Sequence, residues 1–275
     1  MIEIPEAVTL SRQMTDCFSG KAVDRIVAGG SPHKFACYYG DREAYSTIAA
    51  GRTFDGAAAV GGMVEGAVDD VRLLFSEGVR LRRLGPGEPL PAKRQLEVGF
   101  SDGSALIASV QMYGGLGVFL EGENQNPYYL VAREKPSPLD RGFDEVYFDR
   151  LFANPEVVKL SAKAFLATEQ RIPGLGNGVL QDILYRARIH PRRKIKTLRD
   201  PDRVHVFRAL KETLREMTDL GGRDTESDLY GNPGRFATVM SRSNVGKPCP
   251  SCGDTIVKAA YMGGSVYFCP GCQPI

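Results

Sequence analysis

Four cysteines near the end of the chain have the spacing of metal ligands. Cys249 and Cys252 form one CxxC pair, and Cys269 and Cys272 form a second pair after sixteen intervening residues. Each pair can place two thiolates on one metal ion while the segment between them folds back as a hairpin. Four sulfur ligands are typical of a structural Zn²⁺ site, which leaves no open position for catalysis. We therefore expect one structural zinc ion, with disulfides or an iron–sulfur cluster as the alternatives.

A glycine-rich turn in the segment RIPGLGNGVLQDILYRARIHPRR (171–193) could bind a phosphate. Gly174 and Gly176 permit a tight turn immediately before a helix that begins near Asn177. Backbone N–H groups at the start of a helix suit an anion, and Asn177 can cap the helix and also donate to a phosphate oxygen. The alternative for a GxG sequence taken alone is an ordinary turn.

The same helix leads into a strongly basic stretch. Seven basic residues and no acidic residue lie between positions 186 and 199. They are Arg186, Arg188, Arg192, Arg193, Lys194, Lys196 and Arg199. Such a run is either a solvated basic face or the electrostatic footprint of a nucleic acid. Because it follows the glycine turn directly, the combination favours binding to a nucleic-acid backbone.

Two carboxylates, Glu3 and Glu6, lie close to the N-terminal end. Pro5 suits the first position of a helix over residues 5–19, and Glu6 suits the positive end of its dipole. Glu6 therefore has a structural explanation. Glu3 precedes the helix and has none, which makes it a candidate for chemistry.

In this order, these segments resemble the formamidopyrimidine-DNA glycosylase / endonuclease VIII family of DNA repair proteins. KAFLATEQRIPGLGNGVLQDILYRARIHPRR is similar to its helix-two-turn-helix segment, YFCPGCQ to the end of its zinc finger, and EIPEAVTL to its N-terminal signature. The resemblance covers almost the whole chain, although the central β region matches loosely. It implies an α+β fold, with an N-terminal β-sandwich domain flanked by helices and a C-terminal helix-two-turn-helix domain with a β-hairpin zinc finger.

The resemblance also implies a chemistry. In the family an N-terminal proline amine attacks the sugar C1′ of a damaged nucleoside, a Schiff base forms, and elimination cuts the strand. Glu3 matches the glutamate that handles protons, and Glu6 matches a second acid. Lys163 and Asn177 match phosphate-contacting positions. The expected DNA-binding residues are Lys163, Gly174, Gly176, Asn177, Arg186 and Arg188.

Three chemical groups of the family are missing from this chain. Ile2 stands at the proline position, and its bulk should keep Met1 in place. Gly62 replaces a phosphate-binding lysine, and Gly264 replaces the arginine of the zinc hairpin. The family's gap-filling stretch aligns with QMYGG (111–115), which lacks the arginine. These losses predict that Schiff-base strand cleavage is lost, and each missing phosphate contact should reduce the salt dependence of DNA binding by about one unit of slope.

Three functions follow from this pattern. The first is a protein that binds damaged, abasic or distorted duplex DNA without normal lyase activity. The second is an active DNA N-glycosylase, which could be a monofunctional enzyme in which Glu3 activates water to hydrolyse the glycosidic bond. The third is a zinc-ribbon module for protein or RNA contacts on a repair scaffold.

The expected organisation is an N-terminal domain over residues 1–131, a linker over 132–142, a helix-two-turn-helix domain over 143–240 and a zinc finger over 241–275. Residues 21–130 consist mainly of short β-rich runs between turns. Apolar residues at helical spacing predict helices over 179–187 and 204–217.

Composition sets few further limits. The chain has 275 residues, 43% of them hydrophobic and 25% charged, with a net charge of only +2. No apolar run approaches the roughly 18 residues of a membrane span, and no signal peptide is visible. We therefore expect no membrane partner, a cytoplasmic, nucleoid-associated location and, without an extended apolar stripe, a monomer.

Overall fold

Antiparallel strands are the main secondary structure of the first 120 residues in the computed structural model, which describes all 275 residues of the chain. The elements of this region are α1 (Ile4–Phe18), β1 (Val23–Ala28), β2 (Ala36–Tyr39), α2 (Tyr45–Ala49), β3 (Phe54–Val60), β4 (Met63–Val68), β5 (Val71–Leu84), β6 (Leu96–Phe100) and β7 (Ala105–Leu120). The strand order is β1-β6-β7-β5-β4-β3, and β2 adds to β7 as a parallel strand.

The two long strands β5 and β7 run through both halves of the sheet and join them. Their register runs from Val71↔Leu120 to Glu77↔Gly114, then shifts so that Val79 pairs with Val110. Because β7 has two more residues than β5 in this interval, the ladder is bulged there and the strands change direction. Apolar side chains from both halves of the sheet share one core, as in a sandwich.

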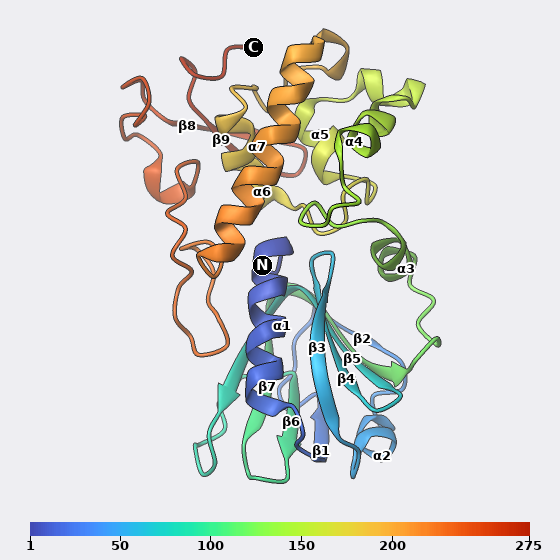
Figure 1. Cartoon of the computed structure of the whole chain (residues 1–275). Helices are drawn as coiled ribbons and strands as arrows, with labels where there is room; N and C mark the ends of the chain where they lie inside the picture. The colour runs from blue at the N-terminus through green and yellow to red at the C-terminus, as the bar shows by residue number, and fades with distance from the viewer. The chain divides into compact units, whose positions relative to one another are not determined.

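Helix α1 lies along β3 and β4 (Figure 1). Leu10, Met14 and Phe18 recur at helical spacing and are buried in the sheet core. Phe18 stacks on Phe100 with 4.3 Å between ring centroids. Each of these two rings also makes a T-shaped contact with Phe54. The helix expected over 5–19 is therefore confirmed, and its apolar stripe is what fixes it to the sheet.

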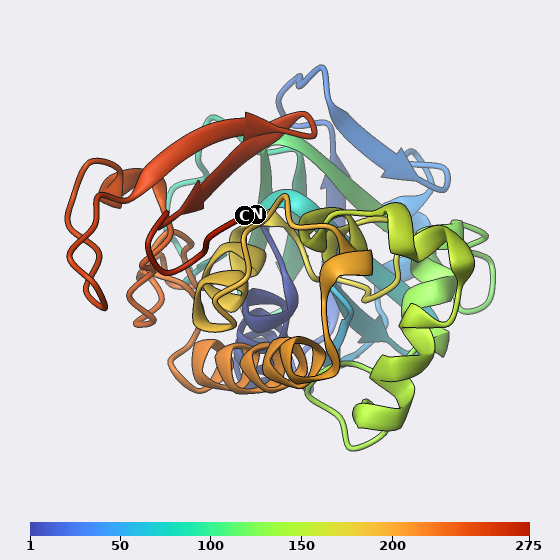
Figure 2. The ribbon, with the colours of Figure 1, turned by 90° about the horizontal axis from the view of Figure 1, so that it is seen from above.

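Helices dominate the rest of the chain (Figure 2). The elements are α3 (Pro127–Glu134), α4 (Glu145–Phe152), η1 (Pro155–Lys159), α5 (Ala162–Ala167), α6 (Asn177–Arg186), η2 (Ile195–Thr197), α7 (Asp200–Asp219), η3 (Arg242–Asn244), β8 (Val257–Tyr261) and β9 (Gly264–Phe268). Strands β8 and β9 form an antiparallel hairpin. The expected α+β fold class is confirmed.

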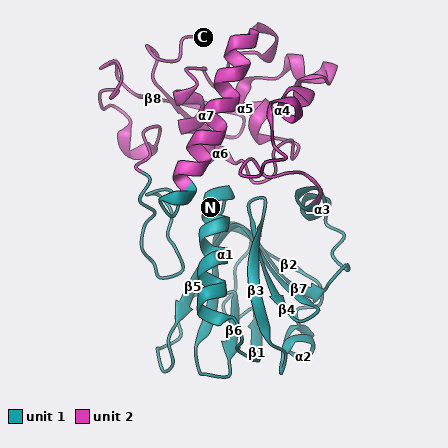
Figure 3. Ribbon diagram, in the orientation of Figure 1, with its two compact units in different colours: residues 1–133, 218–236 teal, residues 134–217, 237–275 magenta.

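The chain divides into two compact units (Figure 3). Unit 1 contains residues 1–133 and 218–236, and unit 2 contains residues 134–217 and 237–275. The stretch 218–236 lies in unit 1 rather than with the helices before it, because Leu229 is part of the sheet core and Arg223 is bound to the first helix. The expected linker begins inside α3. None of the helices combines the length and the hydrophobicity that a membrane-spanning segment needs.

Replacing Phe100 with alanine should strongly destabilise unit 1. The ring is 2% exposed and contacts two other aromatic rings, so truncation leaves a cavity that lowers the free energy of unfolding by about 3–5 kcal/mol. The control is Phe35→Ala, because Phe35 is 54% exposed and its loss should cost less than about 0.5 kcal/mol. Urea unfolding measures both, and equal effects would contradict the assigned core.

Candidate functional site

A buried arginine, Arg223, binds both N-terminal carboxylates. Its side chain is 3% exposed, its Nε donates to Oε1 of Glu6 at 3.0 Å, and its Nη2 donates to Oε2 of the same carboxylate at 2.9 Å. The backbone N–H of Arg223 donates to Glu6 Oε1 at 3.1 Å. Nη1 lies 3.7 Å from Glu3 Oε1. Glu6 is thus held in a bidentate pair, the strongest geometry that an arginine offers a carboxylate.

More charges belong to the same cluster. The ammonium group of Met1 is ion-paired with Glu226, whose Oε1 also lies 4.0 Å from Arg223 Nη2. Burial disfavours the charged guanidinium, but the charges of Glu3 and Glu6 and the hydrogen bond to Glu6 outweigh it and raise the pKa of Arg223 above its ordinary value. Three carboxylates therefore share two cations in a mostly buried site.

The local sequence explains how these groups meet. Helix α1 begins at Ile4, with Pro5 in its first turn and Glu3 as its N-cap residue. Glu6 lies in the first turn as expected, and the backbone N–H of Glu3 donates to Glu6 Oε2 at 3.2 Å, so that the two acids form a capping box. The expectation that Glu3 lacks a structural explanation is therefore wrong. Gly222 has a φ of +102°, which favours glycine, and a Cβ there would stand 3.4 Å from Glu6 Oε1. Glycine at this position lets the backbone of Arg223 approach the carboxylate.

Position 2 is occupied by a core residue. The Ile2 side chain is 6% exposed and belongs to the sheet core. Its backbone N–H donates to the carbonyl oxygen of Glu77 at 2.6 Å. The nitrogen that the family resemblance designates as the nucleophile is therefore a hydrogen-bonded peptide nitrogen, which has no basic lone pair.

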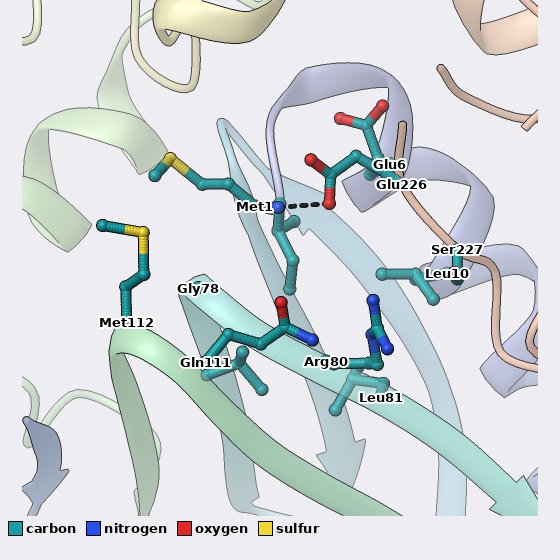
Figure 4. Close-up of a pocket in the computed structure, with 12 residues that line it drawn as sticks. Met1, Glu6, Leu10, Gly78, Arg80, Leu81, Gln111, Met112, Glu226 and Ser227 are labelled. Atoms are coloured by element: carbon teal, nitrogen blue, oxygen red, sulfur yellow. Dashed lines mark hydrogen bonds and ion pairs between the residues drawn. The ribbon is translucent and has the colours of Figure 1, made fainter. Parts of the chain in front are cut away.

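A small pocket of about 80 Å³ lies beside the charge cluster (Figure 4). It is lined by Met1, Ile2, Glu6, Leu10, Gly78, Val79, Arg80, Leu81, Gln111, Met112, Glu226 and Ser227. Gln111 and Met112 come from the bulge of β7, and Met112 is 67% exposed. A Cβ at Gly78 would stand 2.4 Å from the carbonyl oxygen of Tyr113, so that only glycine lets β5 approach the bulge this closely. The first two residues of the stretch QMYGG thus line part of this pocket.

In unit 2, the expected phosphate-binding residues contact the hairpin. Lys163 is buried and its Nζ donates to the carbonyl oxygen of Tyr261 at 2.9 Å, while burial lowers the pKa of its ammonium group. Asn177 Nδ2 and Gln181 Nε2 each donate to the carbonyl oxygen of Ser265 at 3.1 Å. The structure therefore brings Lys163 and Asn177 to one hairpin.

The glycine turn forms as expected, with one correction. Gly174 has a φ of +80°, which a side chain would disfavour. The residue that caps α6 is Gly176, without a side-chain hydrogen bond, and Asn177 is the first helical residue. The prediction that Asn177 caps the helix is wrong because its amide is bound to the hairpin instead.

The two expected arginines lie elsewhere on unit 2. Arg186 and Arg188 stand at the last turn of α6 and just beyond it, roughly 14 Å along the helix axis from its start. Arg186 is ion-paired with Glu216 at 2.6 Å, and Arg188 has a φ of +56°. The structure does not bring these arginines to the hairpin with Asn177.

The four cysteines form a cluster that could hold a metal ion. Their sulfur atoms all lie within 4.8 Å of one another, and Cys249 and Cys269 are buried. Burial opposes ionisation of Cys249, but hydrogen bonds from Tyr185 and from two backbone N–H groups lower the pKa of its thiol to about 6. Burial and the neighbouring thiols raise the pKa of Cys272. A cation is what allows four crowded sulfurs to be thiolates together.

No sequence pattern points to Arg223. It lies in the stretch GGRDTESDLYGNPGRF (221–236), more than 200 residues from its carboxylate partners. No local pattern marks an arginine as buried. The one available signal is the presence of two N-terminal acids with no cation between or beside them in the sequence.

Comparison with known proteins places this fold in one class. No protein-family model matches the chain. The crystal structure of the MutM (Fpg) protein from Thermus thermophilus superposes with a TM-score of 0.81 at 25% identity over 98% of both chains. A complex between Lactococcus lactis Fpg and DNA containing an abasic site superposes with a TM-score of 0.83 at 24% identity, covering 99% of this chain and 100% of that one. The fold is that of a formamidopyrimidine-DNA glycosylase.

Sequence relatives that align along the whole chain agree with this class. The formamidopyrimidine-DNA glycosylase of Cytobacillus firmus is 28% identical over 99% of this chain and 100% of its own length. That of a Bacillus cereus strain is 26% identical over 100% of this chain and 99% of its own length. The chain is a homologue of the formamidopyrimidine-DNA glycosylases along its length, which confirms the family resemblance.

Replacing Arg223 with alanine should destabilise the protein by about 3–5 kcal/mol, because it leaves buried carboxylates without their cation. Adding Glu6→Gln to Arg223→Ala should recover part of the loss by removing one of those charges. The control is Arg12→Ala, an exposed arginine on the same helix as Glu6. Urea unfolding compares the three variants, and a loss in Arg223→Ala as small as in the control would refute the cluster's role.

Proposed function

We propose that this protein binds duplex DNA containing a damaged or abasic nucleotide and does not cut it through a Schiff base. The observation that carries the proposal is Ile2, a core residue whose N–H is bound to Glu77. Solved relatives are complexes with abasic-site DNA and with Fapy-dG-containing DNA, which supports the same class of ligand here.

Nucleophilic attack requires an unprotonated amine within reach of the sugar. The peptide nitrogen of Ile2 cannot serve. The ammonium group of Met1 would have to lose its proton and leave Glu226, and it stands one residue beyond the position that the family uses. A displacement of about 1 Å can already reduce a rate a hundredfold. Imine formation is therefore disfavoured by both charge and position.

The acids are also constrained. Both oxygens of Glu6 accept hydrogen bonds from Arg223, so that this carboxylate serves structure rather than proton transfer. Glu3 lies at 3.7 Å from the same guanidinium. A monofunctional glycosylase that uses Glu3 to activate water is the second candidate function. An assay that scores base release and strand cleavage separately distinguishes this second candidate, because hydrolysis releases the base without cutting the strand.

We also infer that the four-cysteine cluster binds one Zn²⁺ ion. Cys249, Cys252, Cys269 and Cys272 would be its ligands, and a closed set of four thiolates supplies structural support rather than catalysis. The ion would fix the hairpin to α6, because Tyr185 of that helix contacts Cys249 Sγ at 3.3 Å and Ser251 Oγ at 2.6 Å.

The activity prediction is tested with matched duplexes that are intact, carry an abasic site or contain a formamidopyrimidine. We expect tighter binding to the damaged duplexes, no nicking and no covalent adduct after borohydride reduction. A formamidopyrimidine-DNA glycosylase with an N-terminal proline is the positive control. An adduct at Met1 would overturn the proposal. Base release that disappears in Glu3→Gln would establish the second candidate, and absence of duplex binding would favour a protein or RNA interaction module.

The metal prediction concerns Cys269→Ser. Loss of one ligand should abolish stoichiometric zinc and unfold the hairpin, because the module has little core of its own. Elemental analysis and hydrogen exchange over residues 249–272 measure the two effects. Cys37→Ser is the control, since Cys37 is exposed and lies outside the cluster. A fully protected hairpin in Cys269→Ser would refute the assignment.

The DNA-contact prediction compares Asn177→Ala with Gln181→Ala. Both variants lose a hydrogen bond to the carbonyl oxygen of Ser265, but only Asn177 stands at the start of α6 beside the glycine turn. We expect Asn177→Ala to weaken binding to an abasic duplex by roughly tenfold with zinc content unchanged, and Gln181→Ala to bind nearly normally. Equal affinities in the two variants would count against the helix-start contact.

A further inference from the structure

Two cations converge on one tyrosine at the tip of the β8–β9 hairpin. The guanidinium of Arg192 lies 5.0 Å from the ring centroid of Tyr261, and its Nη2 donates to the carbonyl oxygen of Ala260 at 2.9 Å. Lys163 Nζ lies 6.0 Å from the same ring and also donates to the backbone of the hairpin. Each cation is therefore held by one aromatic face and one carbonyl oxygen.

Neither cation has a carboxylate partner. Arg192 and Lys163 form no ion pair, whereas the adjacent Arg193 is ion-paired with Asp202 at 2.8 Å. Lys163 is buried, but Arg192 is exposed. The uncompensated charge at the hairpin tip therefore reaches solvent mainly through Arg192.

The position of Arg192 suits a phosphate. Its planar guanidinium is ordered on Tyr261 in advance, so that less side-chain freedom is lost when it binds an anion. A planar fork of N–H donors matches two oxygens of a phosphodiester. Beside it, Gly264 is exposed and a Cβ there would stand 3.6 Å from Lys163 Nζ, so no side chain at that position covers the second cation.

We propose that Arg192 is a phosphate-binding residue for the backbone of a DNA duplex, and that Tyr261 is the positioning residue that holds it. This inference rests on the proposed function and deepens it. The proposal distinguishes Arg192 from the other basic residues between 186 and 199. A guanidinium that is held in place makes a defined contact with one phosphate, whereas a solvated charge contributes only to the overall electrostatic field.

The test measures the affinity of the zinc-loaded, full-length protein for a duplex with a tetrahydrofuran abasic analogue, by fluorescence anisotropy between about 50 and about 200 mM salt. We expect Arg192→Ala to weaken binding roughly tenfold and to reduce the salt slope by about one unit. Arg193→Ala, which removes the same charge from a paired neighbour, should leave both nearly unchanged. Tyr261→Leu should weaken binding while retaining the slope, because the charge remains and only its position is lost.

Zinc content and thermal unfolding show that each variant is folded, and Arg192→Gln is the second variant because it keeps a donor for Ala260. If Arg192→Ala and Arg193→Ala lower the slope equally, the charge acts diffusely and the inference is overturned. Unchanged binding in Arg192→Ala and Arg192→Gln overturns it as well. If the unmodified protein binds no duplex at all, the proposed function itself fails and the inference falls with it.

Discussion

The bidentate pair between Arg223 and Glu6 is the interaction on which the N-terminal site depends. A buried guanidinium is stable only with carboxylate partners, and buried carboxylates are stable only with a cation. Arg223, Glu3 and Glu6 satisfy both conditions at once. The pair also ties the start of α1 to a segment more than 200 residues later. Glu3 and Glu6, the acids to which the family resemblance assigns catalytic roles, therefore also stabilise the fold.

The two units hold different chemical groups. Unit 1 has kept the acids and the small pocket, but Ile2 joins the core where an amine would be needed. Unit 2 has kept the glycine turn, the hairpin and the four-sulfur cluster. The proposed binding to a charged backbone would rest on the groups that unit 2 still holds, because the cations expected at positions 62 and 264 are replaced by glycine. The proposed loss of Schiff-base chemistry rests on one nitrogen, the hydrogen-bonded peptide nitrogen of Ile2.

Sequence patterns predicted the features that depend on the spacing of nearby residues. The CxxC pairs predicted the cysteine cluster, Pro5 and Glu6 predicted the start of α1, and Gly174 and Gly176 predicted a tight turn. The patterns did not reveal Arg223, because its partners are distant in sequence and burial is a property of the fold. The capping role of Asn177 was mispredicted for a related reason: its side chain bonds to Ser265, and only the folded hairpin brings that carbonyl oxygen within reach. Partners across long loops are set by topology rather than by composition.

The return of residues 218–236 to unit 1 has a consequence for how the protein can be divided. The backbone passes between the units three times, at 133/134, 217/218 and 236/237. No single scission can liberate either unit with all of its chain, and a fragment ending before residue 218 would keep Glu6 while losing its arginine. Neither unit corresponds to one uninterrupted segment of the gene, so a domain swap would have to exchange two separate segments at once.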